Sequence, residues 1–265
     1  MPRLTGIARF LASTAIAAVL AGSTAWCITT QSADTTALIA RPAGPRSDAE
    51  WRRDVEVFGQ RYRADPQDVE VAIRYAQALR AIGQRAQAAA VLEQASIQHP
   101  KNMAVLGAYG RALADAGNYT QALDVLGRAH TPDQPDWNIL SAQGAVLDQL
   151  GRHDEARRYY ASALRIVPDE PSVLSNLGLS YALSKDLANA EATLRRAAER
   201  AGTDPRVRQN LALVIGLQGR FQEAETIVAA DLSPAEAAAN VAYLRQLLAQ
   251  QQRTNDRRRK AEKTR

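Results

Sequence analysis

A period of 34 residues is the feature that most constrains how this 265-residue chain can fold. A fixed repeat of this length predicts a row of similar supersecondary units, because one unit is too small to bury its own apolar face. A helical bundle with a single core gives no reason for such a period. The period is visible first in small residues, which recur at Ala76, Gly110, Gly144, Gly178 and Ala212.

Further kinds of residue keep the same period. Large apolar residues lie three positions after each small one, at Leu79, Leu113, Leu147, Tyr181 and Ile215. Glycine, which suits a helix end that needs a positive φ, follows at Gly83, Gly117, Gly151 and Gly219, with Lys185 in the fourth unit. A second small and large pair comes next, at Ala88, Ala122, Ala156, Ala190 and Ala224 and at Leu92, Leu126, Tyr160, Leu194 and Val228. Each unit is therefore predicted to be two amphipathic helices joined by a tight turn.

This pattern resembles the tetratricopeptide repeat (TPR). In that family, small residues occupy repeat positions 8 and 20, a large apolar residue position 11, and an aromatic residue or leucine position 24. Alanine at position 27 and proline at position 32 are matched by Ala95, Ala129, Ala163 and Ala197 and by Pro100 and Pro168. The resemblance implies an all-α fold, a TPR α-solenoid wound as a right-handed superhelix. Five repeats would then span residues 69–102, 103–136, 137–170, 171–204 and 205–238.

Both ends of the repeat array are predicted to carry a capping helix. Residues 48–68 take the second-helix place of a partial repeat. After the last repeat, Ser233, Pro234 and Glu236 form a helix start, with serine at the N-cap, so a C-terminal capping helix is predicted over 234–252. Residues 253–265, with seven basic and two acidic side chains, are predicted to be a disordered basic tail that is solvated or contacts a membrane or a partner.

The N-terminal residues have the composition of an export signal. Arg3 and Arg9 precede an apolar run over 10–22 that is too short for a typical membrane span, and small residues at 23–25 fit cleavage after residue 25. Residues 1–25 are thus predicted to be a signal peptide. The alternatives are a lipoprotein-like signal with lipid on Cys27, an uncleaved anchor, and no export. Residues 26–47, rich in Thr, Ser, Pro and Gly, are predicted to be a flexible linker.

The sparse reactive residues argue against catalysis. One Cys excludes an intramolecular disulfide framework, and three separated His residues have no metal-ligand spacing. No nucleophile elbow, Walker loop or dinucleotide fingerprint occurs, and the repeats leave no room for a catalytic domain. The net charge of +5 comes from the signal and the tail, and no aromatic residues interleave with the tail. The chain is therefore predicted to be no enzyme, to hold no cofactor or metal, and not to bind nucleic acid.

The predicted binding site is a concave groove lined by the first helix of each repeat. In TPR stacks the residues that face this groove usually occupy positions 2, 5, 6, 9, 12 and 13. Here they are charged toward one end and combine amides with apolar residues toward the other, which suits an extended or helical peptide. A carboxylate clamp is disfavoured, because only Asn176 and Arg206 match its arrangement. The candidate partner-binding residues are Arg74, Gln77, Arg111, Asn138, Asn176, Leu179, Leu183, Arg206, Asn210 and Leu213.

Three segments, 176–198, 204–225 and 231–248, go beyond a generic TPR and resemble the TadD family of tight-adherence (Tad/Flp) pilus assembly systems in Gram-negative bacteria. This resemblance implies a non-enzymatic adaptor for Flp pilus assembly that is exported and periplasmic or associated with the outer membrane. Its partners would be pilus or outer-membrane secretin components, with membrane contact through lipid or the basic tail. Members are usually lipoproteins, whereas Ser23 stands here where their lipidated Cys is expected. The alternative is an envelope TPR adaptor for another secretion or cell-wall assembly pathway.

Overall fold

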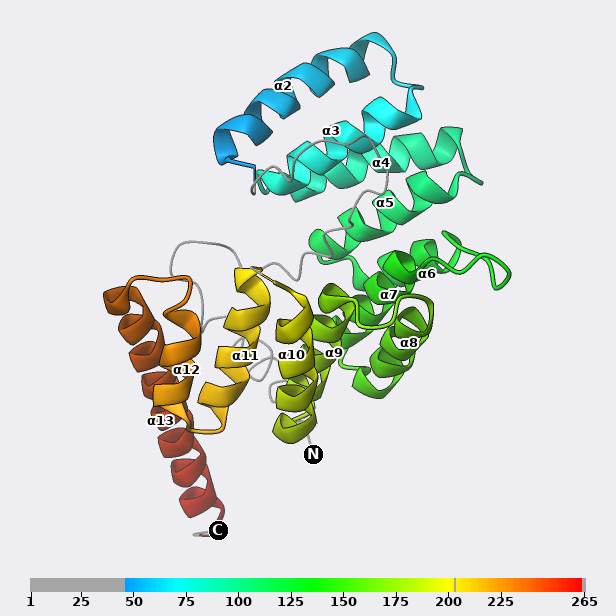
Figure 1. Cartoon of the computed structure of the whole chain (residues 1–265). Coiled ribbons are helices and arrows are strands. Elements are labelled where there is room, and N and C mark those ends of the chain that lie inside the picture. Colours follow the sequence, from blue (N-terminus) through cyan, green and yellow to red (C-terminus); the bar gives the residue numbers. More distant parts are fainter. Residues whose placement is uncertain (1–45, 203, 264–265) are drawn as a thin grey trace. The chain divides into compact units, whose positions relative to one another are not determined.

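The computed structural model describes residues 46–202 and 204–263, and the regular structure in this part of the chain is α-helical. α2 (Asp48–Ala64) comes first and α13 (Pro234–Lys263) last. Between them lie five helix pairs (Figure 1), namely α3 (Val69–Ala81) with α4 (Arg85–Gln98), α5 (Met103–Asp115) with α6 (Tyr119–Gly127), α7 (Trp137–Gln149) with α8 (His153–Ile166), α9 (Pro171–Leu183) with α10 (Leu187–Arg200), and α11 (Pro205–Leu217) with α12 (Phe221–Val228). Successive first helices begin 34 residues apart. The all-α prediction is confirmed.

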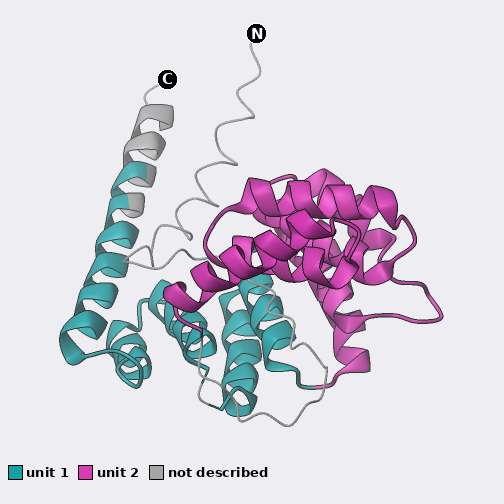
Figure 2. Cartoon of the chain, turned by 90° about the horizontal axis from the view of Figure 1, so that it is seen from above, with its two compact units in different colours: residues 1–28, 169–265 teal, residues 29–168 magenta. Residues whose placement is uncertain are grey.

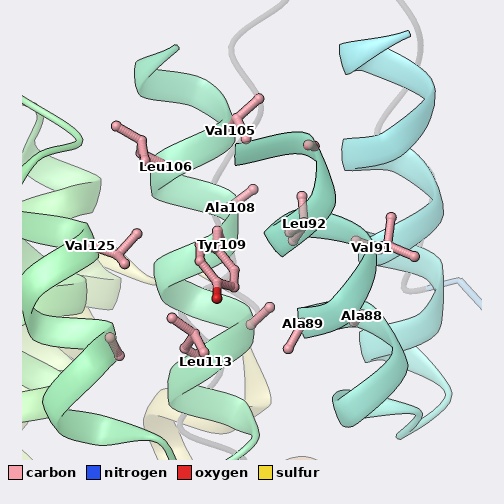
Figure 3. Close-up of a cluster of buried hydrophobic side chains, with 14 of the residues drawn as sticks. Ala88, Ala89, Val91, Leu92, Val105, Leu106, Ala108, Tyr109, Leu113 and Val125 are labelled. Carbon is pink, nitrogen blue, oxygen red and sulfur yellow. The ribbon is translucent and has the colours of Figure 1, made fainter. Parts of the chain in front are cut away.

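Two compact units divide these helices (Figure 2). Among the described residues, unit 2 contains α2–α8 and unit 1 contains α9–α13. Within each unit, apolar side chains of consecutive helices share a core. In unit 2, Leu92 of α4, Tyr109 and Leu113 of α5 and Val125 of α6 are buried in one cluster (Figure 3). In unit 1, the buried cluster joins α10, α11, α12 and α13, through Leu194, Ile215, Val228 and Val241.

Every first helix of a pair starts with the same kind of cap. A side-chain oxygen of the preceding residue accepts a hydrogen bond from a backbone N–H of the first turn, and in α3 the Val71 N–H donates to Asp68 Oδ1 at 3.0 Å. These oxygens satisfy donors that have no partner inside the helix. The last position of one repeat therefore fixes where the next first helix begins. The five capping residues are Asp68, Asn102, Asp136, Glu170 and Asp204.

The turn inside each pair depends on a left-handed residue. Gly83, Gly117, Gly151 and Gly219 have φ values of +80°, +84°, +73° and +84°. In the first repeat, the Gln84 N–H then reaches back to the Leu79 carbonyl oxygen at 2.8 Å, which closes the end of α3. Lys185 holds the same place in the fourth repeat at φ +67°, a conformation that is strained for a residue with a side chain.

The two helices of a pair approach closely at repeat position 8. A methyl group added at Gly110 would lie 2.5 Å from Leu126 Cγ, and one added at Gly178 would lie 2.6 Å from Leu194 Cγ. These distances are shorter than any van der Waals contact between carbon atoms. The small residue of the first helix therefore accommodates the large residue at position 24 of the second helix.

The end helices begin with capping boxes. Ser47 and Glu50 form one at α2, and in the other the Ser233 N–H donates to Glu236 Oε2 at 3.0 Å at the start of α13. α13 then continues to Lys263, so the prediction of a disordered tail is corrected for residues 253–263. The physical reason lies in the sequence after Pro234, which has no Gly or Pro and is rich in Ala, Gln, Arg and Lys, all good helix formers.

The predicted signal peptide (1–25), Cys27 and most of the predicted linker (26–47) lie outside the described residues. Among the helices of the described ranges, none combines the length and the apolar character that a membrane span requires.

Lys185→Gly should stabilise the chain, because glycine adopts the positive φ of this turn without the steric cost that lysine bears. The expected gain is about 1 kcal/mol in the free energy of unfolding, measured by urea denaturation. Gly151→Lys, the reverse change at the matching turn of the third repeat, should lose a similar amount. If Lys185→Gly left the unfolding midpoint unchanged, this result would contradict the presence of backbone strain at residue 185.

Gly144→Ala should destabilise the third repeat, although alanine favours helix more than glycine does. The added methyl group would lie 2.6 Å from Cε1 of the buried Tyr160, so the expected loss is about 1–3 kcal/mol, measured by thermal denaturation. Gly127→Ala in α6 is the control, since the nearest atom to its methyl group would be Gln143 Nε2 at 3.8 Å. Equal effects of the two substitutions would show that close approach does not select glycine at residue 144.

Candidate functional site

The candidate partner-binding residues all lie on first helices of the repeats, in two sets that belong to different units. Arg74, Gln77, Arg111 and Asn138 lie in unit 2, on α3, α5 and α7. The set in unit 1 lies on α9 and α11 and consists of Asn176, Leu179, Leu183, Arg206, Asn210 and Leu213. The contacts of each set lie within its own unit.

In unit 2 all four candidate residues are partly exposed. An Arg74 Nη2 atom lies 4.0 Å from Glu70 Oε1 on the same helix, a loose pair in solvent. Next to this set, Arg80 Nε donates to Asp115 Oδ2 at 2.5 Å, and this ion pair joins α3 to α5 with both side chains largely shielded. The first helices α3, α5 and α7 therefore offer partly exposed arginine, glutamine and asparagine side chains, and an ion pair joins α3 to α5.

A buried carboxylate lies in α7 of the same unit. The Tyr160 hydroxyl donates to Asp148 Oδ2 at 3.0 Å, and His153 Nδ1 lies 2.8 Å from Asp148 Oδ1. Burial, and then the neighbouring carboxylate, raise the pKa of Tyr160 well above its usual value, so its hydroxyl remains a donor. Asp148 is thus held inside the third repeat by two side chains of α8, and the arrangement is structural rather than open to a ligand.

In unit 1 the candidate residues differ in their exposure and in their contacts within the unit. Asn176, Leu179 and Leu183 of α9 are partly exposed. The other three are engaged within the unit. Asn210 Nδ2 donates to Ser175 Oγ at 2.8 Å, which ties α11 to α9.

Arg206 and Leu213 are also engaged within unit 1. Arg206 Nη2 lies 2.9 Å from Asp204 Oδ2, the carboxylate that caps its own helix, although the residue remains exposed. Leu213 is buried in a cluster with Leu244, because α13 covers it. The prediction that Leu213 contacts a partner is therefore wrong for this structure, and the free apolar contribution comes from Leu179 and Leu183.

An ion-pair network joins the second helices of unit 1. Glu191 of α10 accepts hydrogen bonds from Arg220 Nη1 at 2.7 Å, from Arg195 Nη2 at 2.6 Å and from Gln218 Nε2 at 2.8 Å. These bonds, with that of Arg220 the strongest influence, lower the pKa of Glu191 to about 2. The network fixes the fourth repeat to the fifth and leaves the face of the first helices to other contacts.

No metal-ligand set of three or more His, Cys, Asp or Glu side chains occurs among residues 46–202 and 204–263. The three histidines have separate surroundings. His99 Nε2 lies 3.2 Å from the Gln67 carbonyl oxygen, His130 Nε2 lies 3.1 Å from Gln143 Oε1, and His153 contacts Asp148. Each histidine therefore has its nearest polar partner in a different part of the described fold.

Two tetratricopeptide-repeat family models match the sequence, one over residues 83–144 and the other over residues 141–205. The chain carries tetratricopeptide repeats. Together the two matched ranges run from the turn of the first repeat to the start of the fifth, and the described fold is the TPR α-solenoid type that the sequence predicted. No curated protein matches the sequence.

Solved TPR structures resemble the chain in fold. The Cut9–Hcn1 hetero-tetramer of the APC/C matches with a TM-score of 0.62 and 15% identity over 77% of this chain and 40% of its own. PilW, a widely conserved type IV pilus biogenesis factor, matches with a TM-score of 0.60 and 17% identity over 69% and 86%. TTC0263, a TPR protein of Thermus thermophilus, matches with a TM-score of 0.57 and 22% identity over 63% and 91%. At these identities the likeness shows the fold.

Sequence reasoning missed the internal roles of Asp148 and Ser175. The signal for Asp148 was present, because Tyr160 is the one tyrosine among the residues at position 24, and a buried hydroxyl needs a partner. Ser175 gave no signal, since its bond to Asn210 joins two helices that are neighbours only in the folded repeat stack.

Glu191→Gln should lower the free energy of unfolding at neutral pH and change how this free energy depends on pH. In the folded state, hydrogen bonds from neighbouring side chains favour the ionised form of the Glu191 carboxylate and lower its pKa. The stability that this carboxylate contributes is therefore fully present above the usual pKa of 4.5 and is lost as the pH falls toward 2. The stability difference between the wild type and Glu191→Gln should therefore shrink between pH 5 and pH 2 in urea titrations. Glu199→Gln, at an exposed residue of the same helix, is the control and should leave this profile unchanged. A difference that stays constant with pH would contradict the role of Glu191.

Proposed function

We propose that the chain is a non-enzymatic adaptor that binds a protein partner through the exposed parts of its first helices. TPR folds serve protein–protein interaction, and in unit 1 the second helix α10 is engaged with the fifth repeat through the bond between Glu191 and Arg220. The observation that carries the proposal is the partly exposed apolar surface of α9, where Leu179 and Leu183 lie on the same helix as Asn176.

This combination suits an extended or helical peptide. An amide side chain can both donate to and accept from the polar groups of a bound backbone, and the leucines about one and about two turns further along α9 offer apolar contact for its side chains. In unit 2, Arg74 and Arg111 would favour acidic residues of the partner. A partner segment that meets α9 would thus be apolar, and a segment that meets α3 and α5 would be acidic.

The pathway that we propose is the assembly of Tad (Flp) pili. Support comes from the resemblance of residues 176–198, 204–225 and 231–248 to the TadD family, and from the fold shared with PilW, which is itself a pilus biogenesis factor. The export signal expected over residues 1–25 would place the chain in the periplasm or at the outer membrane. Pilus subunits and outer-membrane secretin components are the partners proposed.

A pull-down from envelope extracts, with a deletion strain scored for pili, tests this pathway. Recovery of a pilus or secretin component together with loss of pili would support it. Normal piliation and recovery of components from another envelope pathway would contradict it, and would favour the second candidate, an adaptor for another secretion or cell-wall assembly system.

Leu183→Asp should weaken partner binding at least tenfold, because an unpaired carboxylate buried in an apolar contact costs more than the 1.4 kcal/mol that corresponds to a factor of ten. The measurement is the dissociation constant of the complex with the component recovered by pull-down. Ile97→Asp is the matched control, since Ile97 is an exposed aliphatic residue of a second helix, α4. Equal loss of affinity for both variants would show that α9 has no special role.

A further inference from the structure

The hydrogen bond between Asn210 and Ser175 uses only one end of the Asn210 amide. Asn210 Nδ2 donates to Ser175 Oγ at 2.8 Å, and Ser175 is buried, so this end of the amide belongs to the stack. Among residues 46–202 and 204–263, Asn210 Oδ1 accepts no hydrogen bond. Asn210 is partly exposed, and its Oδ1 is not a buried atom. The oxygen is therefore an unused acceptor on the surface of unit 1.

The same bond fixes the direction of this acceptor. The terminal torsion of an asparagine side chain is broad, so an unrestrained amide presents either its oxygen or its nitrogen to a ligand. Here Nδ2 is held against Ser175 Oγ, and Oδ1, on the other side of the planar amide, is turned away from Ser175. Ser175 of α9 thus determines which atom of Asn210 a partner meets.

The apolar part of the surface lies one to two turns further along α9. Leu179 follows Ser175 by four residues, Leu183 follows by eight, and both leucines are partly exposed. Leu179 and Leu183 are about 6 Å apart along the helix axis, at 1.5 Å per residue. Residues i and i+2 of an extended chain have nearly the same spacing, and their side chains point to one side of the chain. An extended segment lying along α9 can therefore place alternate side chains on the two leucines.

The unused acceptor distinguishes an extended partner from a helical one. Beyond its first turn, a helix has its backbone N–H groups bonded to its own carbonyl oxygens, so it offers no backbone donor to Asn210. An extended segment outside a sheet keeps its N–H groups available. Covering Asn210 Oδ1 without supplying a donor would cost free energy, because the oxygen would lose its contact with water. The extended segment meets both the leucines and the acceptor.

We propose that the surface formed by Asn210, Leu179 and Leu183, which we call the α9–α11 surface, binds an extended segment of the partner. One backbone N–H of this segment donates to Asn210 Oδ1, and alternate apolar side chains contact the two leucines. Ser175 is a positioning residue, which acts by holding the Asn210 amide. The inference rests on the adaptor function proposed above and selects the extended partner over the helical one.

The test uses random dodecapeptides displayed on phage as the probe, selected on the full chain and then synthesised. In each selected peptide, one backbone N–H at a time is replaced by an ester oxygen, which removes the donor and adds no bulk. We expect one internal position at which the ester lowers affinity about fivefold, the size expected of one hydrogen bond. On Asn210→Leu, which has a similar shape but no acceptor, the same ester should lower affinity less than twofold.

Three variants separate binding from stability. Ser175→Ala should reduce the ester effect, because the Asn210 amide is no longer held, whereas a merely structural role of Ser175 would lower the melting temperature and leave the ester effect unchanged. Asn210→Asp keeps an acceptor that can bond to the Ser175 hydroxyl, so it should retain the ester effect. Asn189→Leu, at an exposed asparagine of the second helix α10, is the matched control and should also retain it.

The outcomes distinguish failure of this inference from failure of the adaptor function. Selected peptides that lose affinity on Leu183→Asp, but show no ester effect that depends on Asn210, would overturn the extended mode and leave the adaptor function standing. Peptides that become helical on binding, measured by circular dichroism, would overturn the extended mode as well. If no selected peptide were sensitive to Leu183→Asp, both the adaptor function and this inference would be contradicted.

Discussion

The close contact between a small residue of each first helix and a large residue of its second helix is the constraint on which the structure depends. Leu126 and Leu194 approach Gly110 and Gly178 so closely that a methyl group cannot be inserted. This approach fixes the distance and the rotation of each helix pair. The apolar sides of the pairs then match those of the neighbouring pairs in the same unit, and the buried clusters of both units follow from it.

The faces available for binding are what remains after this packing. In unit 1, α13 buries Leu213, and Asn210 bonds to Ser175, so two of the six candidate residues in that unit serve the stack. Leu179 and Leu183, one repeat earlier, keep part of their surface exposed.

The periodic part of the fold could be predicted from the sequence because periodic residues report local packing. Position 8, the turn glycines and the start of each helix pair were visible without coordinates, and Lys185 at φ +67° shows that the turn persists where glycine is absent. The engagement of Asn210 and Leu213 could not be predicted, because it depends on which helix lies beside them. The helical course of residues 253–263 was missed because the charge of this segment was given more weight than its helix propensity. The caps of the five first helices were also visible in the sequence, because the residue before each of these helices is Asp, Asn or Glu.

The central claim is that a partner binds to the partly exposed sides of the first helices and leaves the second helices unchanged. Hydrogen-exchange mass spectrometry of the free chain and of its complex with the recovered partner measures this directly. If the claim holds, partner binding slows amide exchange in α9, and in α3 or α5, while α4, α8 and α10 exchange as they do in the free chain. Slowed exchange confined to the second helices, with no change in α9, would contradict it.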